Sequence, residues 1–150
     1  MPEYGIARTR KGLLPWRWAT ERLARAHNYW LATAASDGVP HLTAVWGIWL
    51  DDAFLFSTAA SSRKARNLAA KPRCVVSTER ADEAVIVHGD ARLMVDEKDR
   101  ARVARAYERK YGSGFPAESH VYKVIPRVAF GFIERETEFS RAATRWRFDA

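Results

Sequence analysis

One stretch of the chain guides the interpretation of the rest: residues 54–68 read FLFSTAASSRKARNL. A short apolar run ends there, small residues follow, and a helical pattern begins. Hydroxyls and cations surround the start of the expected helix: Ser57, Thr58, Ser62, Arg63 and Lys64. Hydroxyls, free N–H groups at a helix N-terminus and cations all favour an anion, so the stretch predicts a phosphate site. An ordinary capped helix is the alternative, although a basic first turn opposes the helix dipole.

Composition predicts one soluble domain over residues 1–150, because 47% of the residues are apolar and 29% are charged. No apolar run approaches the roughly 20 residues of a membrane helix, so we expect no membrane span. The first residues lack the apolar stretch of a signal peptide. The single cysteine, Cys74, cannot form an internal disulfide. We therefore expect a cytoplasmic location.

The formal net charge of +7 indicates an anionic partner. Nucleic acid, a membrane surface and an anionic small ligand are the three classes that such a charge allows. The sequence has no zinc-ligand spacing, helix-turn-helix signature or ribonucleoprotein motif. An anionic small molecule is therefore the expected ligand, and nucleic acid is not expected as a partner.

Hydrophobic periodicity predicts a mainly antiparallel β-barrel of about six or seven strands with flanking helices. We expect helices at residues 15–27, 61–70 and 96–111. We expect strands at residues 29–35, 39–50, 53–58, 73–78, 84–95, 122–125 and 128–134. Both faces of the 39–50 segment are apolar, which predicts a central strand covered on both sides. Gly89 predicts a bulge in its strand.

The sequence offers no protein-borne catalytic motif. Its four histidines, at positions 27, 41, 88 and 120, have no metal-ligand spacing, so we expect no metal site. No nucleophile-elbow GxSxG occurs. The catalytic residues are therefore unknown from the sequence, and we expect a bound cofactor to supply any reactivity.

Four segments together resemble a known family: residues 37–41 (DGVPH), 43–47 (TAVWG), 56–58 (FST) and 62–68 (SRKARNL). The series resembles the pyridoxamine 5′-phosphate oxidase-like split β-barrel proteins. Within them it is most similar to the actinobacterial flavin/deazaflavin oxidoreductases of the B group. The likeness covers residues 30–91 and continues weakly through residues 144–148. It implies a split β-barrel fold.

Proteins of this family are homodimers that bind FMN or coenzyme F420 in a groove between subunits. The resemblance implies that one strand lies along the cofactor ring through Thr43, Val45, Trp46 and Gly47. It implies that the cofactor phosphate is held by Ser57, Thr58, Ser62, Arg63 and Lys64, with Asn67 behind the helix. It also implies a cofactor contact from Arg145 and Trp146, which either subunit could supply.

Two departures favour coenzyme F420 over FMN. Pyridoxamine phosphate oxidases carry a basic residue at each end of the ring-facing strand, whereas here that strand is apolar around Trp46. They also carry a Gln where this chain has Ala84. The resemblance thus implies an F420-dependent oxidoreductase that transfers hydride to an unsaturated or conjugated small-molecule acceptor, with His41, Tyr29 or solvent as proton donor. An FMN-binding reductase or oxidase and a non-catalytic cofactor-sequestering protein are the alternatives.

A high aromatic content gives separate support for a dimer. The chain has six tryptophans and seven phenylalanines. The interior of a small barrel fills quickly with such large side chains. We therefore expect a partner subunit or a ligand to cover some of the aromatic surface.

Overall fold

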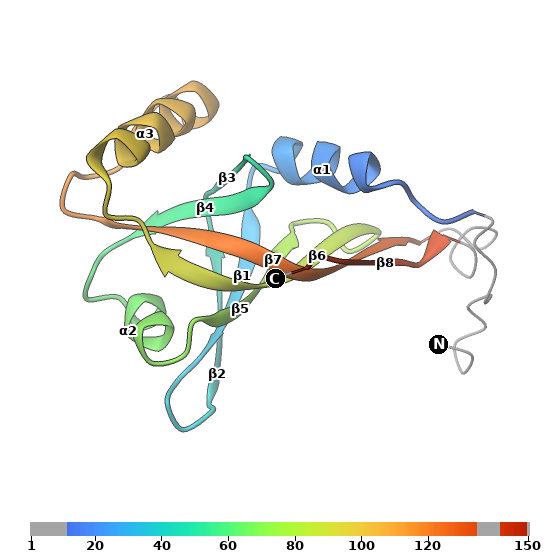
Figure 1. Ribbon diagram of the computed structural model, residues 1–150, viewed down its shortest axis with the longest axis horizontal. Coiled ribbons are helices and arrows are strands. Elements are labelled where there is room, and N and C mark those ends of the chain that lie inside the picture. Colours follow the sequence, from blue (N-terminus) through green and yellow to red (C-terminus); the bar gives the residue numbers. More distant parts are fainter. Residues whose placement is uncertain (1–11, 135–141, 150) are drawn as a thin grey trace.

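The computed structural model describes residues 12–134 and 142–149. In chain order the elements are α1 (Trp16–Arg25), β1 (Tyr29–Ala34), β2 (Pro40–Val45), β3 (Ile48–Leu50), β4 (Ala53–Thr58), α2 (Arg63–Ala70), β5 (Arg73–Thr78), β6 (Glu83–Leu93), α3 (Glu97–Tyr111), β7 (His120–Ile133) and β8 (Thr144–Arg147). Figure 1 shows α1 and α3 on one side of the curled sheet and α2 near one end of it.

The strands form one antiparallel sheet in the order β2-β1-β5-β6-β7-β4-β3, with β8 added to β7. The two longest strands, β6 and β7, lie at its centre. Because the sheet curls around its core without closing edge to edge, it is a half-barrel of the split type (Figure 1). The predicted fold class is confirmed.

The prediction of one central strand over residues 39–50 was wrong. The chain breaks at Trp46 and Gly47, so that β2 pairs with β1 while β3 pairs with β4. The two halves lie at opposite ends of the strand order. A side chain at Gly47 has no room, because its Cβ would lie 2.2 Å from Phe54 Cζ. The apolar residues on both faces reflect packing against different neighbours rather than a doubly covered strand.

The two strands predicted over residues 122–134 are one strand, β7. Its register against β6 shifts where Gly89 pairs with Pro126 and His88 pairs with Val128. Arg127 is therefore the extra residue of a bulge, opposite the predicted irregularity at Gly89. The bulge bends both strands and lets them stay paired over their length.

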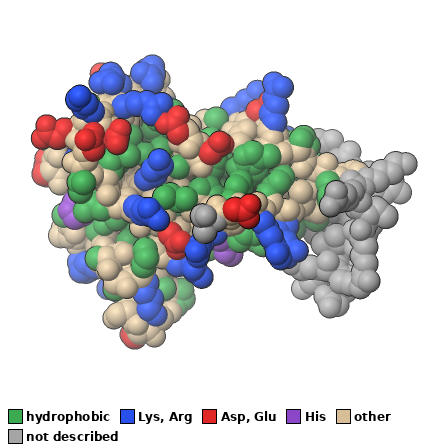
Figure 2. Space-filling view, viewed as in Figure 1, with side chains coloured by type: hydrophobic (Ala, Val, Ile, Leu, Met, Phe, Trp, Pro, Cys, Tyr) green, Lys and Arg blue, Asp and Glu red, His purple; other side chains and the backbone are tan. Residues whose placement is uncertain are grey.

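Three apolar clusters hold the fold together. Inside the half-barrel, Tyr29, Leu31, Phe54 and Phe56 pack around residues of β5 and β7. A second cluster lies beneath α1, and a third lies between α3 and the outer face of β3, β4 and β7. In the view of Figure 2, charged side chains gather over α3 and hydrophobic ones near the middle of the molecule. In the described part of the chain, no helix is long and apolar enough to cross a membrane.

Candidate functional site

The connection from β4 to α2 forms a polar corner. Ser62 is the N-cap of α2, and its Oγ accepts a hydrogen bond from the Ala65 N–H at 3.2 Å. The Thr58 hydroxyl donates to the same oxygen at 3.0 Å. The Ser62 oxygen thus accepts two hydrogen bonds, which leaves its own proton free to donate. Thr58 is only 9% exposed, and this hydrogen bond fixes its side chain in the corner.

Uncompensated positive charge lies directly beside this corner. In residues 12–134 and 142–149, the backbone N–H groups of Arg63 and Lys64 have no acceptor. Their side chains form no ion pair with any described residue either. Free N–H groups at a helix start and two unpaired cations together attract an anion. The arrangement matches the phosphate site that the sequence predicts.

Two histidines near α2 carry buried ring nitrogens that bear on whether this region fits a polar ligand. His120 in β7 lies directly opposite Thr58. His41 in β2 lies opposite Thr33, whose hydroxyl accepts a 3.0 Å bond from the buried amide of Asn67. Both imidazole Nδ1 atoms are buried and have no partner among the described residues. Because buried polar atoms normally have a partner, these two fit a site that a polar ligand or water completes.

Ser57 lies apart from the other predicted phosphate ligands. Successive side chains of a strand point to opposite faces. Thr58 shares the inner face with Phe56, whereas Ser57 shares the outer face with Leu55 and lies near Tyr107 of α3. The structure therefore brings Thr58, Ser62, Arg63 and Lys64 together, with Asn67 anchoring the helix behind them, and leaves Ser57 on the α3 side.

The predicted ring-facing residues lie along β2 and the break after it. Thr43 and Val45 are paired with Leu31 and Tyr29 of β1, so they share the inner face. Because β2 is an edge strand, every second backbone N–H and C=O points away from β1. These groups are available to a ligand. Thr43 lies two residues from His41, which pairs with Thr33, and Thr33 bonds to Asn67 of α2. Thr43 therefore lies toward α2.

The polar backbone groups of Trp46 and Gly47 are instead bonded to α3. The Tyr107 hydroxyl donates to Trp46 O at 2.7 Å. The Tyr111 hydroxyl accepts from the Gly47 N–H at 2.9 Å and lies 2.7 Å from Gly47 O. The Tyr111 ring also stacks on Trp46, with centroids 4.4 Å apart. These contacts fix the break and leave the indole of Trp46 43% exposed.

Lys110 is a polar group beside the predicted ring-facing strand that the sequence did not indicate. Its Nζ donates to Gly47 O at 2.9 Å and to the Tyr29 hydroxyl at 2.7 Å. Burial lowers the pKa of Lys110 to about 8, although the charge of Glu79 opposes this shift. Tyr29 is 1% exposed and its hydroxyl bonds to Leu23 O, so it is not available as the expected proton donor. No local pattern could reveal the amine, since its partners lie in distant segments.

Arg145 and Trp146 lie far from the polar corner within one subunit. They pair with Phe130 and Ala129 of β7. At a rise of about 3.3 Å per residue, this position is roughly 30 Å along the strand from His120. The Trp146 ring packs against Trp16, with centroids 5.2 Å apart. The structure therefore does not bring these two predicted contacts to α2 of the same chain.

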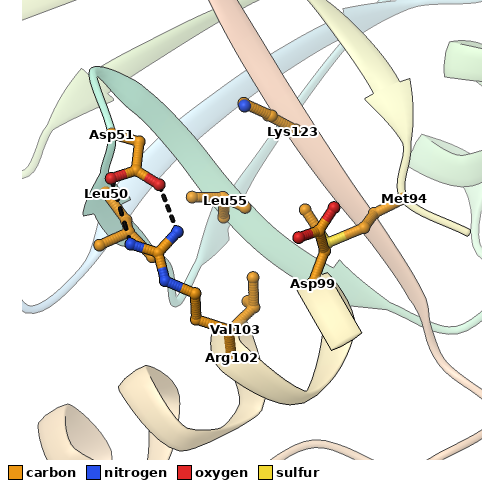
Figure 3. Close-up of a pocket in the computed structure, with 8 residues that line it drawn as sticks. All are labelled: Leu50, Asp51, Leu55, Met94, Asp99, Arg102, Val103 and Lys123. Carbon is orange, nitrogen blue, oxygen red and sulfur yellow. Dashed lines mark hydrogen bonds and ion pairs between the residues drawn. The ribbon is translucent and has the colours of Figure 1, made fainter. Parts of the chain in front are cut away.

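A small cavity of about 110 Å³ lies on the other side of β4, between β3, β7 and α3 (Figure 3). Arg102 of α3 forms a bidentate ion pair with Asp51 at its rim, and this bond lowers the pKa of Asp51. Lys123 and Asp99 extend from opposite walls. Its volume is below the roughly 300 Å³ of ordinary ligand pockets. Among the described residues, no group of three or more His, Cys, Asp and Glu side chains could hold a metal ion.

Comparison with known proteins identifies the sequence over most of its length. The family model for pyridoxamine 5′-phosphate oxidase matches residues 19–138. A conserved hypothetical protein from Mycobacterium tuberculosis has a similar structure, with 22% identity, a TM-score of 0.76, and coverage of 87% of this chain and 92% of that one. No curated protein sequence matches the chain.

Two other similar structures bear different functional names. One, described as an F420 reductase, is 23% identical with a TM-score of 0.61 and covers 73% of this chain and 93% of that one. The other, a heme-binding protein from Mycobacterium smegmatis, is 16% identical with a TM-score of 0.67 and covers 89% of this chain and 59% of that one. At these identities the likeness establishes the fold alone.

Proposed function

Because this chain belongs to the pyridoxamine 5′-phosphate oxidase family, we propose that it is an F420-dependent oxidoreductase. The observation that carries the proposal is the corner between β4 and α2. There the Ser62 hydroxyl and the free N–H groups of Arg63 and Lys64 converge next to two unpaired cations. Such a corner suits the phosphate of a flavin-like cofactor. When bound, coenzyme F420 would supply a hydride to an unsaturated or conjugated acceptor.

The chain's own residues bind and orient in this proposal. Arg63 and Lys64 hold the phosphate, and the exposed edge of β2 around Thr43 and Val45 presents backbone groups to the ring. The apolar character of this strand and the exposed indole of Trp46 favour a deazaflavin over FMN. Holding cofactor and acceptor in contact lowers the barrier by converting a bimolecular step into a unimolecular one. No described side chain is assigned as a proton donor.

We propose a homodimer that places the cofactor between subunits. At the edge of the sheet, Leu42 of β2 is 63% exposed, and Val39, just before β2, is 57% exposed. A face of this kind is typical of a protein interface. In such a dimer, Arg145 and Trp146 of the second subunit would reach the cofactor that they cannot reach in their own.

A non-catalytic binding protein is the second candidate. The observation that favours it is that the polar side chains near the ring-facing strand already have hydrogen-bond partners in the backbone. Tyr107, Tyr111 and Lys110 are all bonded to the backbone at Trp46 and Gly47. They therefore have a structural role that explains them without chemistry. Solved structures with this fold also include one described as a heme-binding protein.

A paired binding and turnover experiment tests the proposal. The purified protein is titrated with oxidised F420 and with FMN, and the fluorescence of each cofactor reports binding. Reduced F420 is then mixed with a panel of quinones and enones while absorbance reports its oxidation. Tight F420 binding with turnover supports the oxidoreductase. Tight binding without oxidation of reduced F420 by any acceptor favours the second candidate, and preferential retention of FMN contradicts the cofactor assignment.

A further inference from the structure

The outer face of the sheet contains a pocket of about 420 Å³ at one end of its central strands. Its apolar walls come from three strands of the sheet: Trp30 of β1, Ala84 and Ile86 of β6, and Phe132 of β7. Trp30 and Ile86 both pair with Ser77 of β5, and Ala84 pairs with Phe132, so these side chains share one face. The volume lies within the roughly 300–1,000 Å³ range of small-molecule pockets.

The described residues that line this pocket carry a charge opposite to that of the protein. The chain carries a formal net charge of +7, yet two carboxylates, Glu79 and Glu134, line the pocket. No lysine or arginine is among the described residues that line it. Glu79 is held in place because its carboxylate accepts hydrogen bonds from the backbone N–H groups of His27 and Asn28. Glu134 forms no ion pair with any described residue.

Aromatic rings and carboxylates in one pocket favour a particular ligand chemistry. A cation gains energy over the face of a tryptophan or phenylalanine ring, and it gains more beside a carboxylate. The apolar walls in turn require a ligand body that benefits from leaving water. We propose that this pocket binds an organic ammonium ion, that is, an apolar or aromatic molecule carrying one positively charged amine.

The position of the pocket separates it from the proposed cofactor site. Trp30 lies directly opposite Ala44 on the outer face of the sheet, whereas Thr43 and Val45 of the ring-facing strand share the inner face. The other lining residues lie on or next to β5, β6 and β7, on the side of β1 away from β2. The binding of an ammonium ion by the pocket therefore does not depend on the proposed function.

Calorimetric titration of the purified protein, without cofactor, tests the pocket itself. Three probes share one body and differ in charge: 4-phenylbutylamine, 4-phenylbutan-1-ol and 4-phenylbutanoate. The amine is expected to bind about tenfold or more tightly than the alcohol, because it alone pairs with the carboxylates. Glu134→Gln is expected to weaken amine binding about two- to fivefold, because Glu134 is exposed, and to leave alcohol binding unchanged. Glu108→Gln, which removes an exposed acid from α3, is the charge-matched control and is expected to have no effect.

Three results separate the pocket from the proposed function. Equal affinity for amine and alcohol, or no binding of either because the second subunit fills the pocket, overturns the assignment. Amine binding that Glu108→Gln weakens as much as Glu134→Gln also overturns it, because the effect then comes from net charge. Selective amine binding that depends on Glu134, in a protein that never oxidises reduced F420, supports the pocket and contradicts only the oxidoreductase.

Discussion

The Nζ of Lys110 lies 2.9 Å from the carbonyl oxygen of Gly47. This bond joins the last turn of α3 to the point where the chain leaves β2 and crosses to β3. The same amine donates to the hydroxyl of Tyr29, which begins β1. One half-buried cation therefore holds together three segments that define the end of the half-barrel beside the proposed ring-facing strand.

The stability of the protein should rise with pH above about 8. The pKa of Lys110 is about 8 in the folded protein, below its ordinary value of 10.5. Between these values the unfolded chain binds more protons than the folded one, so the free energy of unfolding increases with pH. Above pH 10 the rise should reverse, because burial raises the pKa of Tyr29 and Tyr111. Urea denaturation of the wild type and of Lys110→Met from pH 7 to 10 measures the effect. An equal slope in both proteins would contradict the assignment to Lys110.

Substitution of Gly47 by alanine should destabilise the protein by about 1–3 kcal/mol or more, because overpacking forces neighbours to move. The added Cβ would lie 2.2 Å from the Phe54 ring and 2.9 Å from Leu55 O. Gly114→Ala is the matched control, since nothing lies within 4 Å of its Cβ position. Thermal unfolding of both variants compares them. Similar melting temperatures for the two would show that the break at Gly47 adapts easily.

The bond between Asn67 and Thr33 should couple α2 to the sheet. Asn67→Ala leaves the buried Thr33 hydroxyl without its partner and should cost about 1–3 kcal/mol. Thr33→Val removes the other end of the bond. In a double-mutant cycle, the two changes together should cost less than the sum of their separate effects. Strict additivity of the unfolding free energies would mean that the bond contributes nothing.

The exposed apolar face should mediate the proposed dimer. Leu42 is 63% exposed on edge strand β2, and Leu42→Glu places a charge on that face. We expect this variant to elute as a monomer in size-exclusion chromatography while the wild type elutes as a dimer. Val95→Glu is the control, because Val95 is 79% exposed just before α3. A Leu42→Glu variant that remains dimeric would exclude this face as the interface.

The cations at the start of α2 should determine cofactor affinity. Lys64→Ala should weaken F420 binding by about 1.5–3 kcal/mol, or roughly ten- to hundredfold in Kd, through loss of a charge-assisted bond. Lys71→Ala removes an equal charge at the other end of the same helix and should change the Kd little. Fluorescence titration at constant ionic strength compares the variants. An equal loss of F420 affinity in both variants would mean that Lys64 acts only through the net charge of the protein and not through a bond to the phosphate.

Local sequence patterns predicted the parts of the fold that depend on near neighbours. The cap at Ser62 and the irregularity at Gly89 both follow from short-range chemistry. The sequence resemblance grouped Ser57 with Thr58 at the phosphate, whereas the alternation of side chains in a strand places the two on opposite faces.

The break at Trp46 and Gly47 could not be predicted in this way. It depends on Tyr107, Lys110 and Tyr111, which lie more than 60 residues further along the chain. Their spacing on α3 indicates only a buried helix face. The orphaned nitrogens of His41 and His120 depend likewise on strand pairing and on the packing of neighbouring elements. The geometry of the candidate site therefore depends on contacts between distant segments, which only the structure shows.

A crystal structure of the protein with coenzyme F420 tests the central claim most directly. The account predicts that the cofactor phosphate lies within hydrogen-bond distance of the Ser62 hydroxyl and the N–H groups of Arg63 and Lys64. A cofactor bound elsewhere, with only water at the start of α2, would contradict it.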